Sequence, residues 1–132
     1  MAEEVQLLLC RIGTQARAWT VALPLSHVRY VFPAEKLGSL PRRPWPGVPD
    51  AGVQARWGIV VNRPSPSWLA ALHVEAPRAY PLTAVRPVPR LLDAWQARFA
   101  AIAFVLTDEG IVPVIDLTRQ VDTPDTSLPG KR

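Results

Sequence analysis

Residues 108–117 read DEGIVPVIDL, a short strand-like sequence with a proline at its centre. The β-branched residues at positions 111, 112, 114 and 115 favour a strand, yet Pro113 interrupts them. Proline has no amide hydrogen, so within sheets it occurs at edges, at bulges or where a strand bends sharply. A small closed or nearly closed β-barrel provides such corners. The stretch therefore predicts a mostly β protein with a strongly curved sheet.

The other apolar runs of the sequence pair into hairpins with their neighbours. TDEG joins a strand over 99–106 to one over 111–117, and GTQARA joins residues 5–12 to residues 19–25. Two more apolar runs, 58–62 and 68–74, flank the proline-rich loop RPSPS. The sequence thus alternates short strands and turns.

Two short helices are expected among these strands. Ser26 precedes His27, Val28, Val31 and Phe32, whose spacing suits one helical turn with serine as its cap. Residues 90–99 form the second, because the side chains at 91, 92, 95 and 99 share one face.

Two other stretches do not suit regular structure. Residues 41–49, PRRPWPGVP, are irregular or polyproline-like and cannot form an interior strand. Residues 122–132 contain almost nothing apolar to bury, which predicts a disordered tail after a single domain over residues 1–121.

Composition limits the class of protein. The chain has 132 residues, 48% of them hydrophobic, and no apolar run approaches the roughly 18 residues of a membrane span. The start, MAEEVQLLLCRIG, lacks the basic region and cleavage site of a signal peptide. One cysteine excludes an internal disulfide and fits a reducing compartment. We therefore expect a soluble, cytoplasmic protein without membrane insertion.

The net charge of +4 conceals an asymmetry. Residues 11–90 hold ten Arg and one Lys against three acidic residues, about +8, whereas residues 91–132 carry about −2. Arginine binds carboxylates and phosphates through its planar guanidinium group, so acidic proteins and nucleic acid are both admissible partners. A coding bias that replaces Lys with Arg is an equally simple explanation.

A repeat is visible at an offset of 49 residues. Trp19 aligns with Trp68, Leu23 with Leu72 and Arg29 with Arg78. The repeat predicts two similar β-units, one over about residues 5–57 and the other over about residues 58–121.

The order of motifs resembles the CheW-like domain, the adaptor family of bacterial chemosensory signalling. Residues 19–32, WTVALPLSHVRYVF, are similar to the family pattern yalPl..VrEV, and residues 110–117, GIVPVIDL, are similar to its closing motif G.ivPVidL. The segment AVRPVPRLLDAW resembles the linker between them, and the resemblance covers about residues 5–121. It implies two small SH3-like β-barrel subdomains and an adaptor that couples a chemoreceptor to a CheA-like histidine kinase.

The sequence departs from the family pattern in two places, which limits the family properties that can be assigned to this chain. Tyr30 stands where the family often has a glutamate. The first unit also lacks a clear closing hairpin between Phe32 and the second unit, so either the first barrel is incomplete or the repeat is misread. If it is incomplete, residues 41–49 should cover it through Trp45 without a strand partner, and its remaining edge should bind a second copy or a partner strand.

The resemblance places a contact surface on the turn after the second strand, at Val28, Arg29, Tyr30 and Val31. Tryptophans are enriched at interfaces. Trp19 and Trp68 occupy equivalent positions of the repeat and are expected in the core. Trp45 lies in the proline-rich loop and Trp57 follows Arg56, so we expect these three residues to be further contact residues.

Residues that could support catalysis are few and scattered. Structural roles are expected for His27, His73, Cys10 and Asp116, since they show neither metal-ligand spacing nor a paired reactive group. We expect no catalytic residue, metal or cofactor. The alternative function is a small basic barrel that binds nucleic acid through Trp45, Trp57 and six arginines, at positions 42, 43, 56, 63, 86 and 90.

Overall fold

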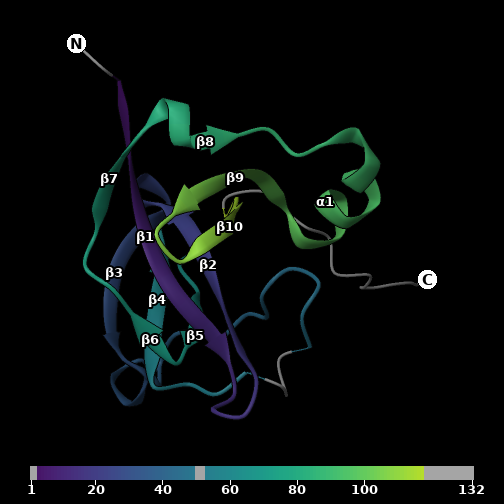
Figure 1. Cartoon of the computed structure of the whole chain (residues 1–132). Coiled ribbons are helices and arrows are strands. Elements are labelled where there is room, and N and C mark those ends of the chain that lie inside the picture. Colours follow the sequence, from purple (N-terminus) through teal and green to yellow (C-terminus); the bar gives the residue numbers. More distant parts are fainter. Residues whose placement is uncertain (1–2, 50–52, 118–132) are drawn as a thin grey trace.

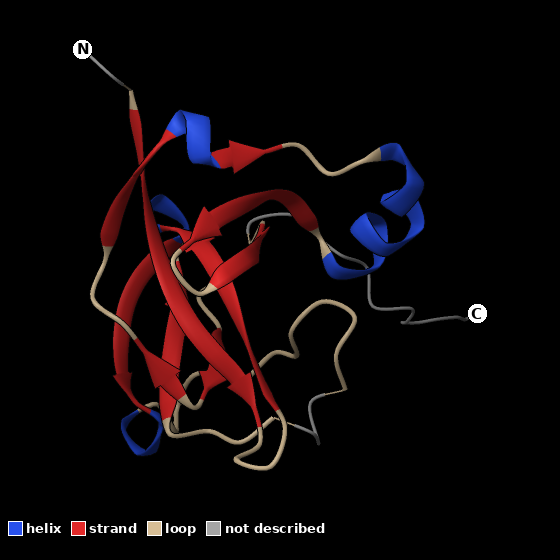
Figure 2. Ribbon diagram, in the orientation of Figure 1, coloured by secondary structure: helices blue, strands red, loops and turns tan. Residues whose placement is uncertain are grey.

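The structure, a computed structural model, describes residues 3–49 and 53–117. It is mostly β, with two sheets, one short α-helix and several 3-10 turns, so the predicted fold class is confirmed (Figures 1 and 2). The strands are β1 (Glu4–Gly13), β2 (Ala18–Pro24), β3 (Val28–Pro33), β4 (Trp57–Val61), β5 (Trp68–Ala71), β6 (His73–Val74), β7 (Arg78–Pro81), β8 (Val85–Arg86), β9 (Ala101–Thr107) and β10 (Gly110–Ile115). The helix is α1 (Asp93–Phe99), and the 3-10 turns are η1 (Leu25–His27), η2 (Ala34–Lys36), η4 (Leu82–Ala84) and η5 (Arg90–Leu92).

The long strand β1 connects the two halves of the molecule. It pairs antiparallel with β2 on one edge, and with β6 and then β7 on the other. The larger sheet continues from β2 through β10 and β9 to β8. A three-stranded sheet of β3, β4 and β5 completes the first half (Figure 1).

Strand β10 shows how the proline of DEGIVPVIDL is accommodated. Pro113 lies opposite Phe104 of β9, and the register shifts immediately afterwards, between Val114 and Ile115. On the other edge, β10 meets β2 in parallel at one pair, Val114 with Ala22. The proline therefore lies beside an irregularity in a strand with little pairing on its second edge, as the sequence predicted.

The pairing of strand β4 shows that the repeat was aligned incorrectly in the sequence. Strand β4 is hydrogen-bonded to β3 along the length of β3 and to β5 on its other edge, so β4 and β5 are the closing hairpin of the first unit. Of the two alternatives, an incomplete first barrel or a misread repeat, the strand pairing supports the misread repeat. The predicted unit boundary at residues 57 and 58 would separate β3 from its partner strand.

The repeat is real, but its offset is 57 residues rather than 49. Leu25 begins η1 and Leu82 begins η4, and each turn is followed at once by a strand, β3 or β8. ALPLSHVRYV at 22–31 and AYPLTAVRPV at 79–88 are identical at six of ten positions. Strand β8 then pairs with β9, and β9 with β10, in the same order as β3, β4 and β5. Each unit thus consists of a strand, a 3-10 turn, a strand and a hairpin.

Two clusters of buried side chains form the core. The larger lies between β1, β2 and the sheet β3–β5 and includes Leu23, Ile59 and Leu69. The smaller lies on the opposite faces of β1 and β2, against β7, β9 and β10, and is centred on Leu7 and Val105. Alternate residues of β1 thus enter different clusters, which makes its register decisive for both units.

The helical turn expected after Ser26 was wrong. The 3-10 turn η1 is only three residues long, its N-cap residue is Pro24 rather than serine, and it makes no side-chain cap bond. Val28 and Val31 belong to β3, because β-branched side chains suit a strand and pairing with β4 outweighs their helix-like spacing. The second helix was predicted correctly as η5 and α1, except that Leu91 is 94% exposed.

The proline-rich segment 41–49 packs on the first unit through Trp45, as predicted. It does have a strand partner, however, contrary to expectation: Arg42 bridges to Trp68, the Arg43 N–H donates to the Trp68 carbonyl at 2.9 Å, and the Trp68 N–H donates to the Pro41 carbonyl at 3.0 Å. The segment can pair with β5 because Arg43 supplies the amide hydrogen and Pro41, which lacks one, supplies only its carbonyl. The tail expected over residues 122–132 lies outside the described residues.

Candidate functional site

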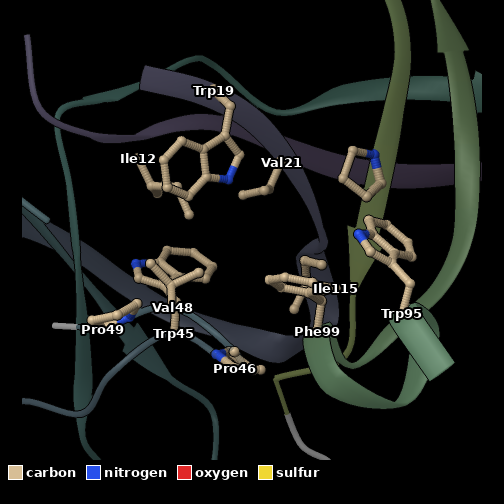
Figure 3. Close-up of a pocket in the computed structure, with 12 residues that line it drawn as sticks. Ile12, Trp19, Val21, Trp45, Pro46, Val48, Pro49, Trp95, Phe99 and Ile115 are labelled. Carbon is tan, nitrogen blue, oxygen red and sulfur yellow. The ribbon is translucent and has the colours of Figure 1, made fainter. Parts of the chain in front are cut away.

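An aromatic pocket lies where the two units meet. It has a volume of about 410 Å³. Its walls come from β1 and β2, from segment 45–49, from α1 and from β10 (Figure 3). The lining residues are Ile12, Trp19, Val21, Trp45, Pro46, Gly47, Val48, Pro49, Trp95, Phe99, Pro113 and Ile115.

The three tryptophans of this aromatic pocket differ in their hydrogen bonds. Trp45 is 2% exposed and donates its indole N–H to the Ala70 carbonyl at 2.7 Å. Neither Trp19 nor Trp95 makes a side-chain hydrogen bond within residues 3–49 and 53–117. In Figure 3 their ring nitrogens lie on the sides of the rings that face the cavity. The pocket therefore presents apolar rings together with two available donors.

The helical wall of the pocket is held by ring contacts. The Trp95 ring lies 5.4 Å from that of Phe99 and stacks 5.6 Å from that of Phe104 of β9. The Arg98 guanidinium lies 5.4 Å from the centre of the Phe99 ring, which brings a positive charge to this wall. Across from it, Gly47 has φ +74°, and a β-carbon there would lie 2.8 Å from the Arg98 carbonyl oxygen. The close approach of the two walls therefore depends on glycine.

A second surface, the β3 surface, consists of Arg29, Tyr30 and Phe32. All three side chains are exposed, and the Tyr30 and Phe32 rings stack at 5.5 Å. Within the described residues β3 pairs only with β4, so its other edge is open. Val28 and Val31, the other two contact residues predicted here, are half-buried against the core and support this strand.

The remaining predicted contact residues are divided between the two surfaces. Trp57 begins β4 opposite Pro33 and is 38% exposed, next to the exposed Arg56. The structure therefore places Arg56 and Trp57 beside the far end of β3. Trp45 does not join them, because it is buried at the base of the aromatic pocket.

The titratable groups singled out in the sequence lie in structural surroundings. His27 Nδ1 lies 3.5 Å from Asp116 Oδ1, which links η1 of the first unit to the end of β10. Burial, followed by the charge of Glu75, raises the pKa of the Cys10 thiol, so this cysteine is held in its unreactive form. Across the described part of the chain no group of three His, Cys, Asp or Glu side chains could hold a metal ion.

Two of the six arginines of the nucleic-acid hypothesis make contacts within the protein. Arg42 donates to the Val53 carbonyl at 2.8 Å and lies 5.5 Å from the Trp68 ring centre. Arg43 donates to the Leu117 carbonyl at 3.5 Å, and burial, followed by the charge of Arg63, lowers its pKa. Two of the six arginines are therefore used internally, and Trp45 cannot stack on a base.

Comparison with known proteins adds no family to this description: no protein-family model matches the chain, and no curated protein is similar to it. Among the residues that the structure describes, no helix is long and apolar enough to cross a membrane.

Sequence reasoning missed the aromatic pocket. Trp19 was expected in the core but is 39% exposed and lines the pocket, whereas Trp68 is buried as expected. Trp95 and Phe99 were predicted correctly on one helical face, but nothing in their spacing shows what that face meets. One feature of the sequence could have indicated a pocket: five tryptophans in 132 residues are more than a core of this size requires.

Proposed function

We propose that the chain is a non-enzymatic adaptor that couples a chemoreceptor-type sensor to a CheA-like histidine kinase in the cytoplasm. Its activity would be to bind both partners and position them. The proposal comes from the resemblance to CheW-like domains, and the duplicated unit is the observation that supports it most directly. Residues 22–31 and again residues 79–88 resemble the family pattern yalPl..VrEV at its proline, leucine, valine and arginine positions, although Tyr30 and Pro87 replace the glutamate. Both copies fold as a strand, a 3-10 turn and a strand.

The two copies differ at one edge, and this difference favours β3 as the contact strand. At the offset of 57 residues, Tyr30 and Phe32 correspond to Pro87 and Pro89. Prolines after β8 leave that edge without amide donors, which discourages strand addition. The edge of β3 keeps its donors and adds two exposed aromatic rings, which are features of an interface.

Electrostatic attraction would guide an acidic partner to the β3 surface. Arg29 is exposed on β3, and most of the positive charge lies in residues 11–90. A basic surface speeds association with an acidic partner and does so less at high salt. We therefore assign Arg29 to the approach of the partner, and Tyr30 and Phe32 to the buried part of the contact.

The test compares Arg29→Glu with Arg86→Glu, the equivalent exposed position of the second unit. Binding to the regulatory domain of a histidine kinase, and separately to the signalling tip of a chemoreceptor, is measured by biolayer interferometry at two salt concentrations. We expect Arg29→Glu to weaken one of these complexes at least tenfold and Arg86→Glu to change it less than twofold. Equal effects of the two variants would overturn the assignment of β3.

Absence of binding to either partner class by the unmodified chain would overturn the adaptor function itself. The nucleic-acid alternative makes the opposite prediction, namely binding to single-stranded DNA or RNA that weakens steeply with salt. The internal contacts of Arg42 and Arg43, and the burial of Trp45, do not favour it.

A further inference from the structure

The side chains that line the aromatic pocket accept no hydrogen bonds. Its walls are aliphatic and aromatic groups and proline rings. The polar side-chain atoms of its lining residues are the indole N–H groups of Trp19, Trp45 and Trp95, and that of Trp45 already donates to the Ala70 carbonyl. A ligand suited to this pocket offers carbonyl acceptors and apolar rings but few donors, because a buried donor without a partner is costly. A proline-containing peptide has this chemistry, since each prolyl nitrogen lacks a hydrogen and its ring stacks well on aromatic side chains.

The chain itself continues from beside this pocket. Ile115 lines it, and two residues later the carbonyl of Leu117 accepts a hydrogen bond from Arg43, which lies two residues before the pocket residue Trp45. Residues 118–132, beyond Leu117, read TRQVDTPDTSLPGKR. Pro124 lies seven residues past Leu117, which allows a reach of roughly 23 Å for an extended chain. The length of the segment is therefore sufficient for Pro124 to reach the pocket.

Charge also matches this segment to the pocket. Asp122 and Asp125 flank Pro124, and the guanidinium of Arg98 lies over the ring of Phe99 in the pocket wall. An aspartate beside the proline could approach this arginine while the prolyl ring lies between the tryptophans. The basic end of the segment, Lys131 and Arg132, lies beyond the second proline.

We propose that residues 121–130, VDTPDTSLPG, bind in the aromatic pocket of their own chain, with a prolyl ring between Trp19 and Trp95 and a backbone carbonyl accepting an indole N–H. The proposal does not depend on the adaptor function. A tethered segment experiences a local concentration in the millimolar range, so millimolar intrinsic affinity is enough for substantial occupancy. The low apolar content of the segment is therefore compatible with binding.

The test uses the full-length chain and observes the five indole N–H groups by nuclear magnetic resonance. Thr126→Cys provides one labelling site for a nitroxide, since Cys10 is buried. We expect the label to broaden the indole signals of Trp19 and Trp95, and the broadening to fall at least twofold when Pro124 and Pro129 are both replaced by alanine. The Trp57 signal, outside the pocket, is the internal reference.

A mixture of labelled chains with isotope-enriched, unlabelled chains separates contacts within one chain from contacts between copies. Broadening that appears only between chains would overturn the proposal and assign the pocket to a second copy. Unchanged Trp19 and Trp95 signals in the proline variant would also overturn it. If those signals then respond to an added external proline-rich peptide, the pocket serves a different partner.

Discussion

At Gly58 of β4 the segment that follows β3 packs directly on the strand, and this contact allows a quantitative test of the corrected fold. A β-carbon at residue 58 would overlap Leu37 Cδ1 and lie 2.9 Å from Trp68 Cε3. Alanine gains about 0.5–1 kcal/mol over glycine in a strand, but overpacking a well-filled site costs about 1–3 kcal/mol. We expect Gly58→Ala to lower the free energy of unfolding by about 1–2 kcal/mol.

Leu37→Ala should relieve this overlap while creating a void of its own. Leu37 is 4% exposed, so its truncation alone should cost about 2–3 kcal/mol. In the double variant the new methyl group occupies part of the space that Leu37 vacates, so the double variant should be about 1 kcal/mol more stable than the sum of the two single changes implies.

Urea unfolding followed by circular dichroism measures this coupling, provided that the m-value is unchanged. Gly38→Ala is the matched control, because a β-carbon there meets no atom within 4 Å, and it should change stability by less than about 0.5 kcal/mol. Strict additivity of Leu37→Ala and Gly58→Ala would refute the packing of this segment on β4.

Three further predictions concern the pocket and the core. Gly47→Ala should destabilise the protein by about 1–3 kcal/mol, because φ is +74° and a β-carbon would lie 2.8 Å from the Phe99 ring; an unchanged thermal midpoint would contradict this. Trp45→Phe should cost about 1–3 kcal/mol in urea unfolding, since it removes the donor to the Ala70 carbonyl, and a cost below about 0.5 kcal/mol would mean that this bond contributes little. The Cys10 thiol should react with a disulfide reagent only as fast as the chain unfolds. Its pKa in the folded state is raised above the ordinary value of 9.0, so above about pH 9 the thiol ionises more readily in the unfolded state. The free energy of unfolding should therefore fall as the pH rises from 8 to 10, which urea titrations at these two pH values would detect.

Much of the strand content could be predicted because it depends on local signals. The hairpins β1–β2 and β9–β10 have alternating apolar residues and polar turns at the predicted places. The position of Pro113 beside a register shift also followed from local chemistry, because a missing amide hydrogen restricts where a strand can place the residue. The short helix before β9 followed from the spacing of its apolar residues.

Pairing between distant segments could not be predicted in the same way. The alignment of Trp19 with Trp68 at an offset of 49 rested on apolar residues that are common in this chain, and it assigned β4 to the wrong unit. The match between ALPLSHVRYV and AYPLTAVRPV was present in the sequence and gives the correct offset. The spacing of Val28, Val31 and Phe32 suits a helix equally well, and only pairing with β4 makes them a strand.

The aromatic pocket follows from how the two copies of the unit differ. Each copy must connect its second strand to its hairpin, and in each copy that connection packs against the hairpin. In the first copy segment 37–49 packs over β4 and β5 through Leu37 and Trp45, and in the second copy η5 and α1 pack over β9 through the stack of Trp95 on Phe104. The pocket lies between these two connections, where Gly47 approaches Phe99. The pocket thus combines residues of both connections with residues of β1, β2 and β10. The β3 surface lies elsewhere and consists of Arg29, Tyr30 and Phe32, of which the two aromatic residues are replaced by prolines in the second copy. Because the two places share no residue, substitutions in one should leave the structure of the other intact.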